Sequence, residues 1–275
     1  MLQDGTAVRD ATLAFDLDIA AIPAPTPTLS AEKQRMADAV AYARRPVYTF
    51  DNGALAAVFA GGGAVHVREA LDRDSIAVLH AAADELLQNW TELAASNCLP
   101  AALEVPLRRR YIPLGALGDL EGRLRSSLPP SFAALARQYL GKEPMLATDS
   151  HVRSITLDRP DAHLPFHQDE TILGRRLLNV WIPLDACGVD APGLELVWNS
   201  WTRRLDPAPS PEATYPVERA RLDPVEVERT FGRASRWRPV FAAGDAMVFS
   251  GATIHRTYVQ TEMTRARLSV EIRLL

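Results

Sequence analysis

The apolar positions of the N-terminal half repeat with the period of a helix. In residues 72–95 they recur at intervals of three and four and form one stripe, made by Ile76, Leu79, Ala83, Leu86, Leu87, Trp90 and Leu93. A second helix is predicted over 131–140, after a proline pair and before Gly141, which suits a left-handed C-cap. The composition of residues 30–45 predicts a third helix, preceded by a proline-rich arm.

The C-terminal half has a different pattern. Short runs rich in Val, Ile, Thr and Trp are broken by Pro, Gly and Asp, at 145–148, 151–157, 177–185, 194–198, 246–250 and 267–275. Runs of this length between turns are typical of a β-sandwich or barrel. A further short strand is expected at 65–70, after three glycines that lack the Lys-Ser/Thr of a phosphate loop.

Together these patterns predict one domain that is mainly β with helices (α+β), the helices being packed outside a β core. Residues 1–60 would form the arm and its helix, 61–145 a supporting strand and helices, and 146–275 the core. The segment 202–240, rich in Pro, Arg and Glu, is expected to be a long insertion between strands. Long loops of this kind often act as lids over a site.

Composition and charge argue against several classes of function. The 275 residues are 47% hydrophobic and 23% charged with a net charge of −4, so neither nucleic acid nor an anionic membrane is favoured as a partner. Two cysteines, Cys98 and Cys187, are too few for a disulfide framework or a cysteine-based zinc site and indicate a cytoplasmic location. The acidic N-terminus does not resemble a signal peptide, and no stretch approaches the roughly 20 apolar residues of a membrane span.

The stretch PFHQDE carries the first candidate chemistry. In a strand, residues two apart point to the same side, so His167 and Asp169 would aim an imidazole and a carboxylate at one point. His255 follows a predicted strand and a glycine break, and across a barrel it can face this pair. Two imidazoles and one carboxylate with open positions make the facial triad of non-haem Fe(II) oxygenases. On its own the pattern is weak, because an exposed aspartate beside a packed histidine would look the same.

The other histidines have other interpretations. His80 lies in the amphipathic helix as an ordinary surface or boundary residue, and His66, in the strand after the glycines, suits a structural role. His163 is separated from His167 by a proline and a loop, so shared ligation is not expected. His151 begins a predicted strand and is a candidate pocket residue.

The last predicted strand supports a charged cavity. Along it, Arg267, Ser269, Glu271 and Arg273 share one face, and Leu268, Val270, Ile272 and Leu274 share the other. If the apolar face packs under the helices, the polar face lines the barrel, where an unpaired charge is costly. A dicarboxylate would pair with Arg267 in bidentate fashion, and Ser269 would add a hydroxyl donor. The alternative is a structural network in which Arg267 pairs with Glu271 or another acid.

The segment 177–185 repeats this alternation. Its apolar positions would face the helices, while Asn179 and Trp181 would face inward. Trp181 is therefore a candidate wall of the pocket, although core packing is the commoner fate of a tryptophan.

Several of these motifs resemble those of a known family. FHQDE, NVWIPLD, GDAMVFSGATIH and the closing Arg-x-Ser are similar to the phytanoyl-CoA dioxygenase-like branch of the Fe(II)/2-oxoglutarate oxygenases, and so is GAVHVREALDRDSIAVLHAAADELL. The resemblance covers about residues 60–275. It implies a double-stranded β-helix, or jelly-roll, core with the N-terminal helices on the outer face of the major sheet. It also implies that His167, Asp169 and His255 bind iron.

The resemblance further implies an arginine that holds the distal carboxylate of 2-oxoglutarate. The family often places it a fixed step after the second histidine, which here falls between Arg265 and Arg267. We choose Arg267, because Ser269 completes the usual Arg-x-Ser arrangement, and keep Arg265 as the alternative. Asn179 and Trp181 are also expected to line the cosubstrate site.

The expected function is a non-haem dioxygenase that uses Fe(II), 2-oxoglutarate and O2 and releases succinate and CO2. Because Asp169 stands where halogenation would need a vacant position, hydroxylation of a small-molecule, carrier-bound or CoA-bound substrate in secondary metabolism is the default expectation. Two alternatives stay open: a cupin-type hydrolase or isomerase with a divalent metal, and a non-catalytic jelly-roll binding module. Three arginines, Arg153, Arg203 and Arg204, suit either an acidic group on the substrate or a solvated surface. Desaturation, epoxidation or ring closure would use the same ligands, and the sequence does not distinguish them from hydroxylation. It also specifies neither the substrate nor the oligomeric state.

Overall fold

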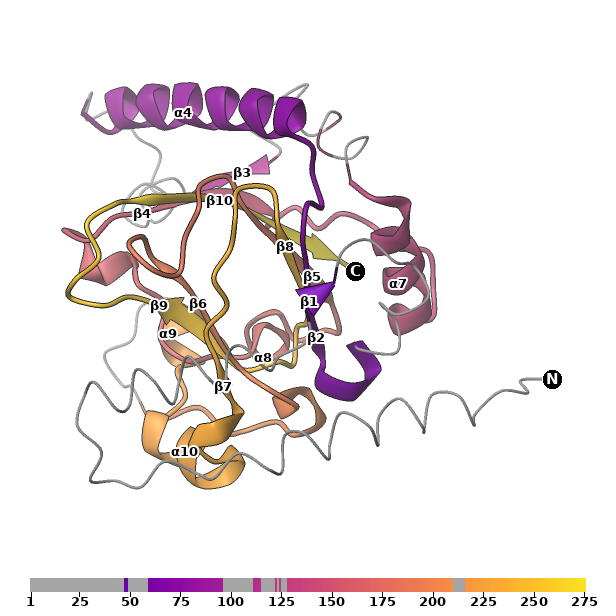
Figure 1. Ribbon diagram of the computed structural model, residues 1–275. Coiled ribbons are helices and arrows are strands. Elements are labelled where there is room, and N and C mark those ends of the chain that lie inside the picture. Colours follow the sequence, from indigo (N-terminus) through magenta and orange to yellow (C-terminus); the bar gives the residue numbers. More distant parts are fainter. Residues whose placement is uncertain are drawn as a thin grey trace.

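Two β-sheets face each other across the interior of the molecule, and the longer helices lie outside them (Figure 1). The computed structural model describes residues 47–48, 59–95, 111–114, 122, 124, 128–209 and 216–275. The major sheet has seven strands in the order β1-β2-β8-β5-β10-β4-β3, and the minor sheet has three in the order β7-β6-β9.

Nearly all neighbouring strands run antiparallel; β1 and β2 are the parallel pair among the described strands. The major sheet consists of β1 (Val47–Tyr48), β2 (Ala64–Val67), β8 (Ala246–Ser250), β5 (Leu178–Pro183), β10 (Arg267–Leu274), β4 (His151–Ile155) and β3 (Tyr111–Pro113). The minor sheet consists of β7 (Arg236–Trp237), β6 (Gly193–Val197) and β9 (His255–Tyr258). The predicted class, mainly β with helices, is confirmed.

The last strand, β10, lies between β5 and β4 and separates the core from the cavity. Leu268, Val270 and Ile272 are buried in the main hydrophobic core. Residues of the opposite face, among them Arg267 and Glu271, line a cavity between the two sheets. The predicted alternation therefore holds along this strand, and it turns a row of charged side chains inward.

Helix α4 (Arg73–Ala95) lies over β10, β4 and β3, on the side of the major sheet that faces away from the minor sheet (Figure 1). Its Leu79 and Ala83 join the main core, as the apolar stripe predicts. His80 Nε2 lies 3.1 Å from Asp185 Oδ1, and Asp185 also accepts a hydrogen bond from the backbone N–H of Leu268. The helix predicted over 72–95 is confirmed. The contact of His80 with Asp185 connects this helix to the segment that directly follows β5.

Helix α7 (Pro130–Leu140) confirms the second prediction. Gly141 ends it with φ 73°, in the left-handed region, and donates its N–H to the Arg137 carbonyl. The strand predicted at 145–148 is reduced to a single bridge, Leu146 with Leu274. The helix predicted over 30–45 lies outside the described residues. None of the described helices combines the length and apolar composition that crossing a bilayer requires.

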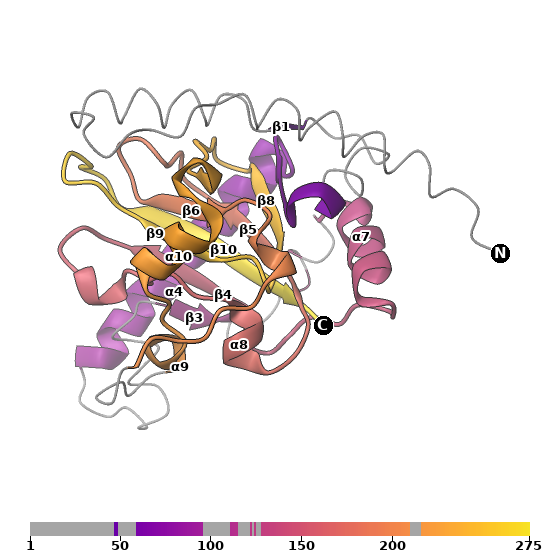
Figure 2. The same cartoon turned by 90° about the horizontal axis from the view of Figure 1, so that it is seen from below.

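The long connection between β6 and β7 forms a small core of its own. It contains η3 (Ser200–Thr202), α9 (Pro216–Arg219), α10 (Pro224–Phe231) and η4 (Arg233–Ser235). Figures 1 and 2 show α10 on the side of the minor sheet that faces away from the major sheet. Leu222 and Val227 of this connection pack with Phe166 and Ile254. The segment predicted as an insertion thus packs behind the two residues that directly precede His167 and His255.

Candidate metal centre

His167 and Asp169 converge, but not because both lie in a strand. His167 makes one isolated bridge, Gln168 is extended with φ −122° and ψ 123°, and Asp169 begins the short helix α8 (Asp169–Leu173). The prediction of a strand through Asp169 is therefore wrong. The two side chains still point the same way, because one extended residue between them is enough to produce the alternation.

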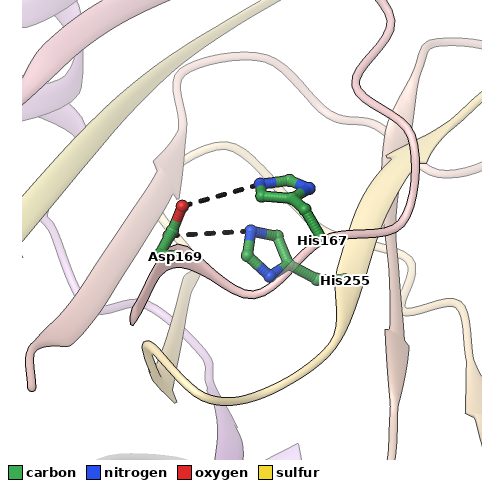
Figure 3. A group of neighbouring side chains, drawn as sticks. All are labelled: His167, Asp169 and His255. Atoms are coloured by element: carbon green, nitrogen blue, oxygen red, sulfur yellow. Dashed lines mark ion pairs between the residues drawn. The ribbon is translucent and has the colours of Figure 1, made fainter. Parts of the chain in front are cut away.

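His255, which is distant from this pair in the sequence, lies beside it in the fold. It is the first residue of β9, and its backbone pairs with that of His167. The two ring centroids lie 4.2 Å apart, with 49° between the ring planes. Figure 3 shows both imidazoles directed toward the Asp169 carboxylate.

The donor atoms are close enough for a single ion. His167 Nε2 lies 3.5 Å from Asp169 Oδ1, and His255 Nε2 lies 3.8 Å from Asp169 Oδ2. One ligand atom from each residue falls within 4.8 Å of the others, and all three residues are buried. The set of two imidazoles and one carboxylate matches the facial triad that Fe(II) oxygenases use.

Backbone carbonyls fix the tautomer of each histidine. Nδ1 of His167 lies 2.8 Å from the Pro165 carbonyl oxygen, and Nδ1 of His255 lies 2.9 Å from that of Thr253. A carbonyl oxygen only accepts, so each Nδ1 carries the proton and donates it. Each Nε2 is left with its lone pair directed toward the ligand cluster, as a metal ligand requires.

Two side chains hold the Asp169 carboxylate. Asn179 donates from Nδ2 to Oδ2 at 2.8 Å, and Arg273 donates from Nη2 to Oδ1 at 3.4 Å. Burial alone would raise the pKa of Asp169, but Arg273 and the two histidines hold it well below its ordinary value. Burial lowers the pKa of His255 to about 4. At neutral pH the cluster therefore presents a carboxylate and an uncharged His255.

Arg267 lies inside the cavity, where the inward face of β10 was expected to place it. Only 2% of its surface is exposed, and Nη1 donates to the carbonyls of Pro192 and Gly193 at 3.4 and 3.2 Å. Its guanidinium carbon lies 4.9 Å from the centre of a Trp181 ring. In the described part of the chain, Arg267 Nε and Ser269 Oγ have no hydrogen-bond partner.

Arg265 and Glu271 take other partners. Arg265 is on the surface, where it forms a bidentate pair with Asp190 at 2.8 and 2.9 Å. Glu271 pairs with His151 at 2.9 Å, and its Oε1 lies 3.8 Å from Arg153 Nε. The described contacts therefore include no ion pair between Arg267 and Glu271, and a buried cation is left facing the cavity.

Of the other predicted site residues, Asn179 and Trp181 line this cavity, at its metal end and at its Arg267 end, respectively. Asn179 was expected at the cosubstrate, and the structure places it against Asp169. Trp181 lies under Arg267, and its Nε1 has no hydrogen-bond partner in the described residues. His151 does not line the cavity itself but pairs with Glu271, which does. His163 does not join the metal cluster, and its Nε2 lies 2.9 Å from the Thr156 carbonyl oxygen.

Sequence reasoning assigned no role to Arg273 or to Gln168. Arg273 joins Asp169 to Asp149, with Nη1 3.0 Å from Asp149 Oδ2. Gln168 donates to the carbonyls of Arg203 and Ala252, so it ties the triad to the connection after β6 and to the turn before His255. For Arg273 the alternating face of β10 was an available signal; for Gln168 the sequence contained none.

Comparisons with known proteins bear on the family and the fold of the chain. A family model described as Phytanoyl-CoA dioxygenase (PhyH) matches residues 59–265. No curated protein matches. A crystal structure of the epimerase SnoN with Fe3+, alpha ketoglutarate and nogalamycin RO is 23% identical, with 82% of this chain and 83% of that chain covered at a TM-score of 0.55.

Two further solved structures share the fold. EvdO2 from Micromonospora carbonacea var. aurantiaca, complexed with 2-oxoglutarate, is 19% identical, with 84% of this chain and 92% of that chain covered at a TM-score of 0.57. EctD from S. alaskensis, with 2-oxoglutarate and 5-hydroxyectoine, is 17% identical, with 80% and 74% covered at a TM-score of 0.55. At these identities the likeness establishes a common fold.

Proposed function

Because the chain belongs to the phytanoyl-CoA dioxygenase (PhyH) family, we propose that it is an oxygenase dependent on Fe(II) and 2-oxoglutarate. In this proposal His167, Asp169 and His255 hold the iron, and Arg267 with Ser269 holds the distal carboxylate of 2-oxoglutarate. The observation that carries it is the pairing of two buried features in one cavity. One end has three converging metal donors, and the other has a buried guanidinium that forms no ion pair with an acid among the described residues.

The polar groups of the cavity fit such a cosubstrate. Arg267 Nε, Ser269 Oγ and Trp181 Nε1 are buried and have no hydrogen-bond partner among the described residues. Buried donors of this kind are costly unless something accepts from them. The dianion of 2-oxoglutarate has five oxygen atoms and no donor, so it supplies the acceptors that this wall lacks.

Bound iron, with O2 and 2-oxoglutarate, supplies the oxidising chemistry, and succinate and CO2 are released. The residues of the chain orient and shield the reactants. The Pro165 and Thr253 carbonyls keep both Nε2 atoms available, while Asn179 fixes the Asp169 carboxylate. Arg267 sets the direction in which the cosubstrate extends from the metal end, and so contributes the positioning on which the rate depends.

Hydroxylation of a small-molecule, carrier-bound or CoA-bound substrate is the proposed outcome, with a place in secondary metabolism. The presence of a carboxylate at position 169 supports hydroxylation over halogenation. The epimerase SnoN and the 5-hydroxyectoine complex of EctD indicate that one fold supports several outcomes. The low cysteine content supports a cytoplasmic location.

A divalent-metal hydrolase is the main alternative, and one experiment separates the two. Anaerobic addition of Fe(II) and 2-oxoglutarate to the proposed oxygenase should produce a weak visible charge-transfer band. His167→Ala should abolish the band, whereas His163→Ala, the removal of a neighbouring imidazole that bonds Thr156, should preserve it. A wild-type protein that shows no band and no 2-oxoglutarate-dependent succinate would contradict the proposal.

A further inference from the structure

The cavity contains a second carboxylate that the proposed function does not use. Glu271 lines the same cavity as the triad, on the face of β10 that also carries Arg267 and Arg273. In the sheet it is opposite Trp181 on β5 and His151 on β4. Because Arg273 contacts Asp169 and Arg267 marks the distal end, Glu271 lies between the metal end and the distal-carboxylate end of the cavity.

Glu271 carries a negative charge that is open to the cavity. Burial alone would raise its pKa, but His151 and Arg153 hold the pKa below its ordinary value. Its side chain is 18% exposed, against 3% for that of Asp169. Because Glu271 lines the cavity from the inward face of the sheet, this exposed surface faces the cavity.

The carboxylate also keeps capacity to accept hydrogen bonds. His151 Nε2 lies 2.9 Å from Oε2, but Arg153 Nε lies 3.8 Å from Oε1, which is beyond hydrogen-bond reach. A carboxylate has about four acceptor sites. A donor that enters the cavity can therefore bind Glu271 without displacing His151.

The cosubstrate is not that donor. Two carboxylates held close together repel each other, so Glu271 disfavours a carboxylate of 2-oxoglutarate beside itself and favours placing the two cosubstrate carboxylates at the metal end and at Arg267. Among the described residues that line this cavity, the acidic ones are Asp169 and Glu271. With Asp169 assigned to the metal, Glu271 is the anionic group left for the substrate.

Building on the proposed function, we propose that Glu271 recognises the substrate and that the substrate carries a cationic nitrogen, either a protonated amine or a guanidinium. Such a group would make a charge-assisted hydrogen bond to Glu271 in a cavity that screens it little. An acidic substrate fits less well, because Arg203 and Arg204 do not line the cavity and Arg204 instead lies 3.3 Å from Glu170. Arg153 does line the cavity, but its Nε lies 3.8 Å from Glu271 Oε1, so an anion at Arg153 would also meet that carboxylate.

Matched pairs of small molecules test this specificity. The probes are n-butylguanidine with its neutral isostere n-butylurea, and n-pentylamine with its neutral isostere 1-pentanol, each at millimolar concentration. Protein loaded anaerobically with Fe(II) and 2-oxoglutarate is mixed with one probe, and succinate is measured after O2 is admitted. In the wild type, the cationic member of at least one pair should stimulate succinate release more than its neutral partner, by on the order of tenfold to a hundredfold.

Three variants assign the preference to Glu271. Glu271→Gln keeps the shape and removes the charge, so the preference for the cation should disappear while the charge-transfer band with 2-oxoglutarate remains. Glu271→Asp keeps the charge and should retain the preference. Glu143→Gln, which removes an exposed acid that pairs with Arg137, should behave as the wild type.

The outcomes separate this proposal from the proposed function. A wild type with no charge-transfer band contradicts the oxygenase assignment itself. If the band forms but neutral probes stimulate as strongly, or no cationic probe stimulates, the substrate proposal is overturned. Loss of the band in Glu271→Gln also overturns it, because Glu271 would then maintain the cosubstrate site.

Discussion

His167 and His255 exchange two backbone hydrogen bonds, each N–H donating to the carbonyl oxygen of the other residue at 3.0 and 3.1 Å. This single rung joins segments 88 residues apart in sequence (255 − 167) and sets both imidazoles beside Asp169. Because backbone atoms make the rung, it does not depend on the side chains that it positions. Variants of either imidazole are therefore expected to fold.

Loss of one imidazole should remove metal binding without unfolding the protein. His255→Ala is expected to weaken Co(II) binding, measured by calorimetry as a redox-stable substitute for Fe(II), by more than about 100-fold, because losing even an outer partner of a ligand costs roughly 10- to 100-fold. His80→Ala, on α4, is the control and should bind Co(II) as the wild type does. Equal affinities in His255→Ala and the wild type would rule out this cluster as the metal site.

The two candidate arginines should differ sharply in their effect on 2-oxoglutarate. Arg267→Met is expected to raise the dissociation constant for 2-oxoglutarate by roughly 10- to 100-fold, because it removes charge-assisted hydrogen bonds from a buried site. Arg265→Met removes an exposed pair with Asp190, worth little in solution, and should leave the constant nearly unchanged. Titration of the anaerobic Fe(II) protein, followed by the charge-transfer band, measures both. The reverse order would assign the cosubstrate to Arg265.

These two arginines show how far sequence reasoning reaches. Both fall near the expected step after His255, and spacing alone does not separate them. The alternation of β10 and the serine two residues on favoured Arg267, and the structure places that residue inside the cavity. Period-two patterning is local, so it can be read from the chain, and it predicted the inward face of β10 correctly.

Contacts between strands that are distant in the sequence could not be predicted from this local alternation. Glu271 meets His151 because β10 pairs with β4 in one particular register, across 120 residues of sequence (271 − 151). Arg273 meets Asp149 for the same reason, at the turn before β4. Register between strands so far apart depends on packing of the whole sheet, which no local pattern specifies. The extended conformation at Gln168, followed at once by a helix, was also beyond a simple strand rule.

The two groups that hold Asp169 should affect metal affinity more than overall stability. Arg273→Met removes the contact to Oδ1 and is expected to weaken Co(II) binding by about 10- to 100-fold, as loss of an outer partner of a metal ligand does. Asn179→Ala should have an effect of similar size through Oδ2. Arg229→Met, which removes an exposed pair with Glu226, is the matched control. Wild-type Co(II) affinity in Arg273→Met, accompanied by lower stability, would show a purely structural role.

The connection after β6 should stabilise the fold through its small core. Val227 is 1% exposed and packs in the cluster that contains Phe166 and Ile254, whereas Val225, on the same helix, is 73% exposed. Val227→Ala is expected to lower the free energy of unfolding by about 1–3 kcal/mol, from lost burial and the cavity left behind. Val225→Ala should change it by less than about 0.5 kcal/mol. If urea unfolding gave the same loss of unfolding free energy for both variants, packing in this small core would not account for the effect of Val227→Ala.

The stability of the metal-free protein should fall as the pH is lowered, and His255 gives the reason. Burial lowers its pKa from the ordinary 6.5 to about 4, so between these values the unfolded chain binds a proton that the folded protein does not. The contribution is complete above about pH 6.5 and is lost as the pH falls toward 4; it amounts to at most about 3–4 kcal/mol. The lowered pKa of Asp169 acts in the same direction at still lower pH.

Urea unfolding in the presence of a chelator, from neutral pH down to about pH 4, measures this slope. His255→Gln cannot take up the proton in either state, so its free energy of unfolding should vary less with pH across the same interval. His80→Gln, which removes a half-exposed imidazole on α4, should keep the slope of the wild type. If His255→Gln kept the full slope, the proton uptake would belong to another group. A buried, uncharged His255 would then not explain the loss of stability in acid.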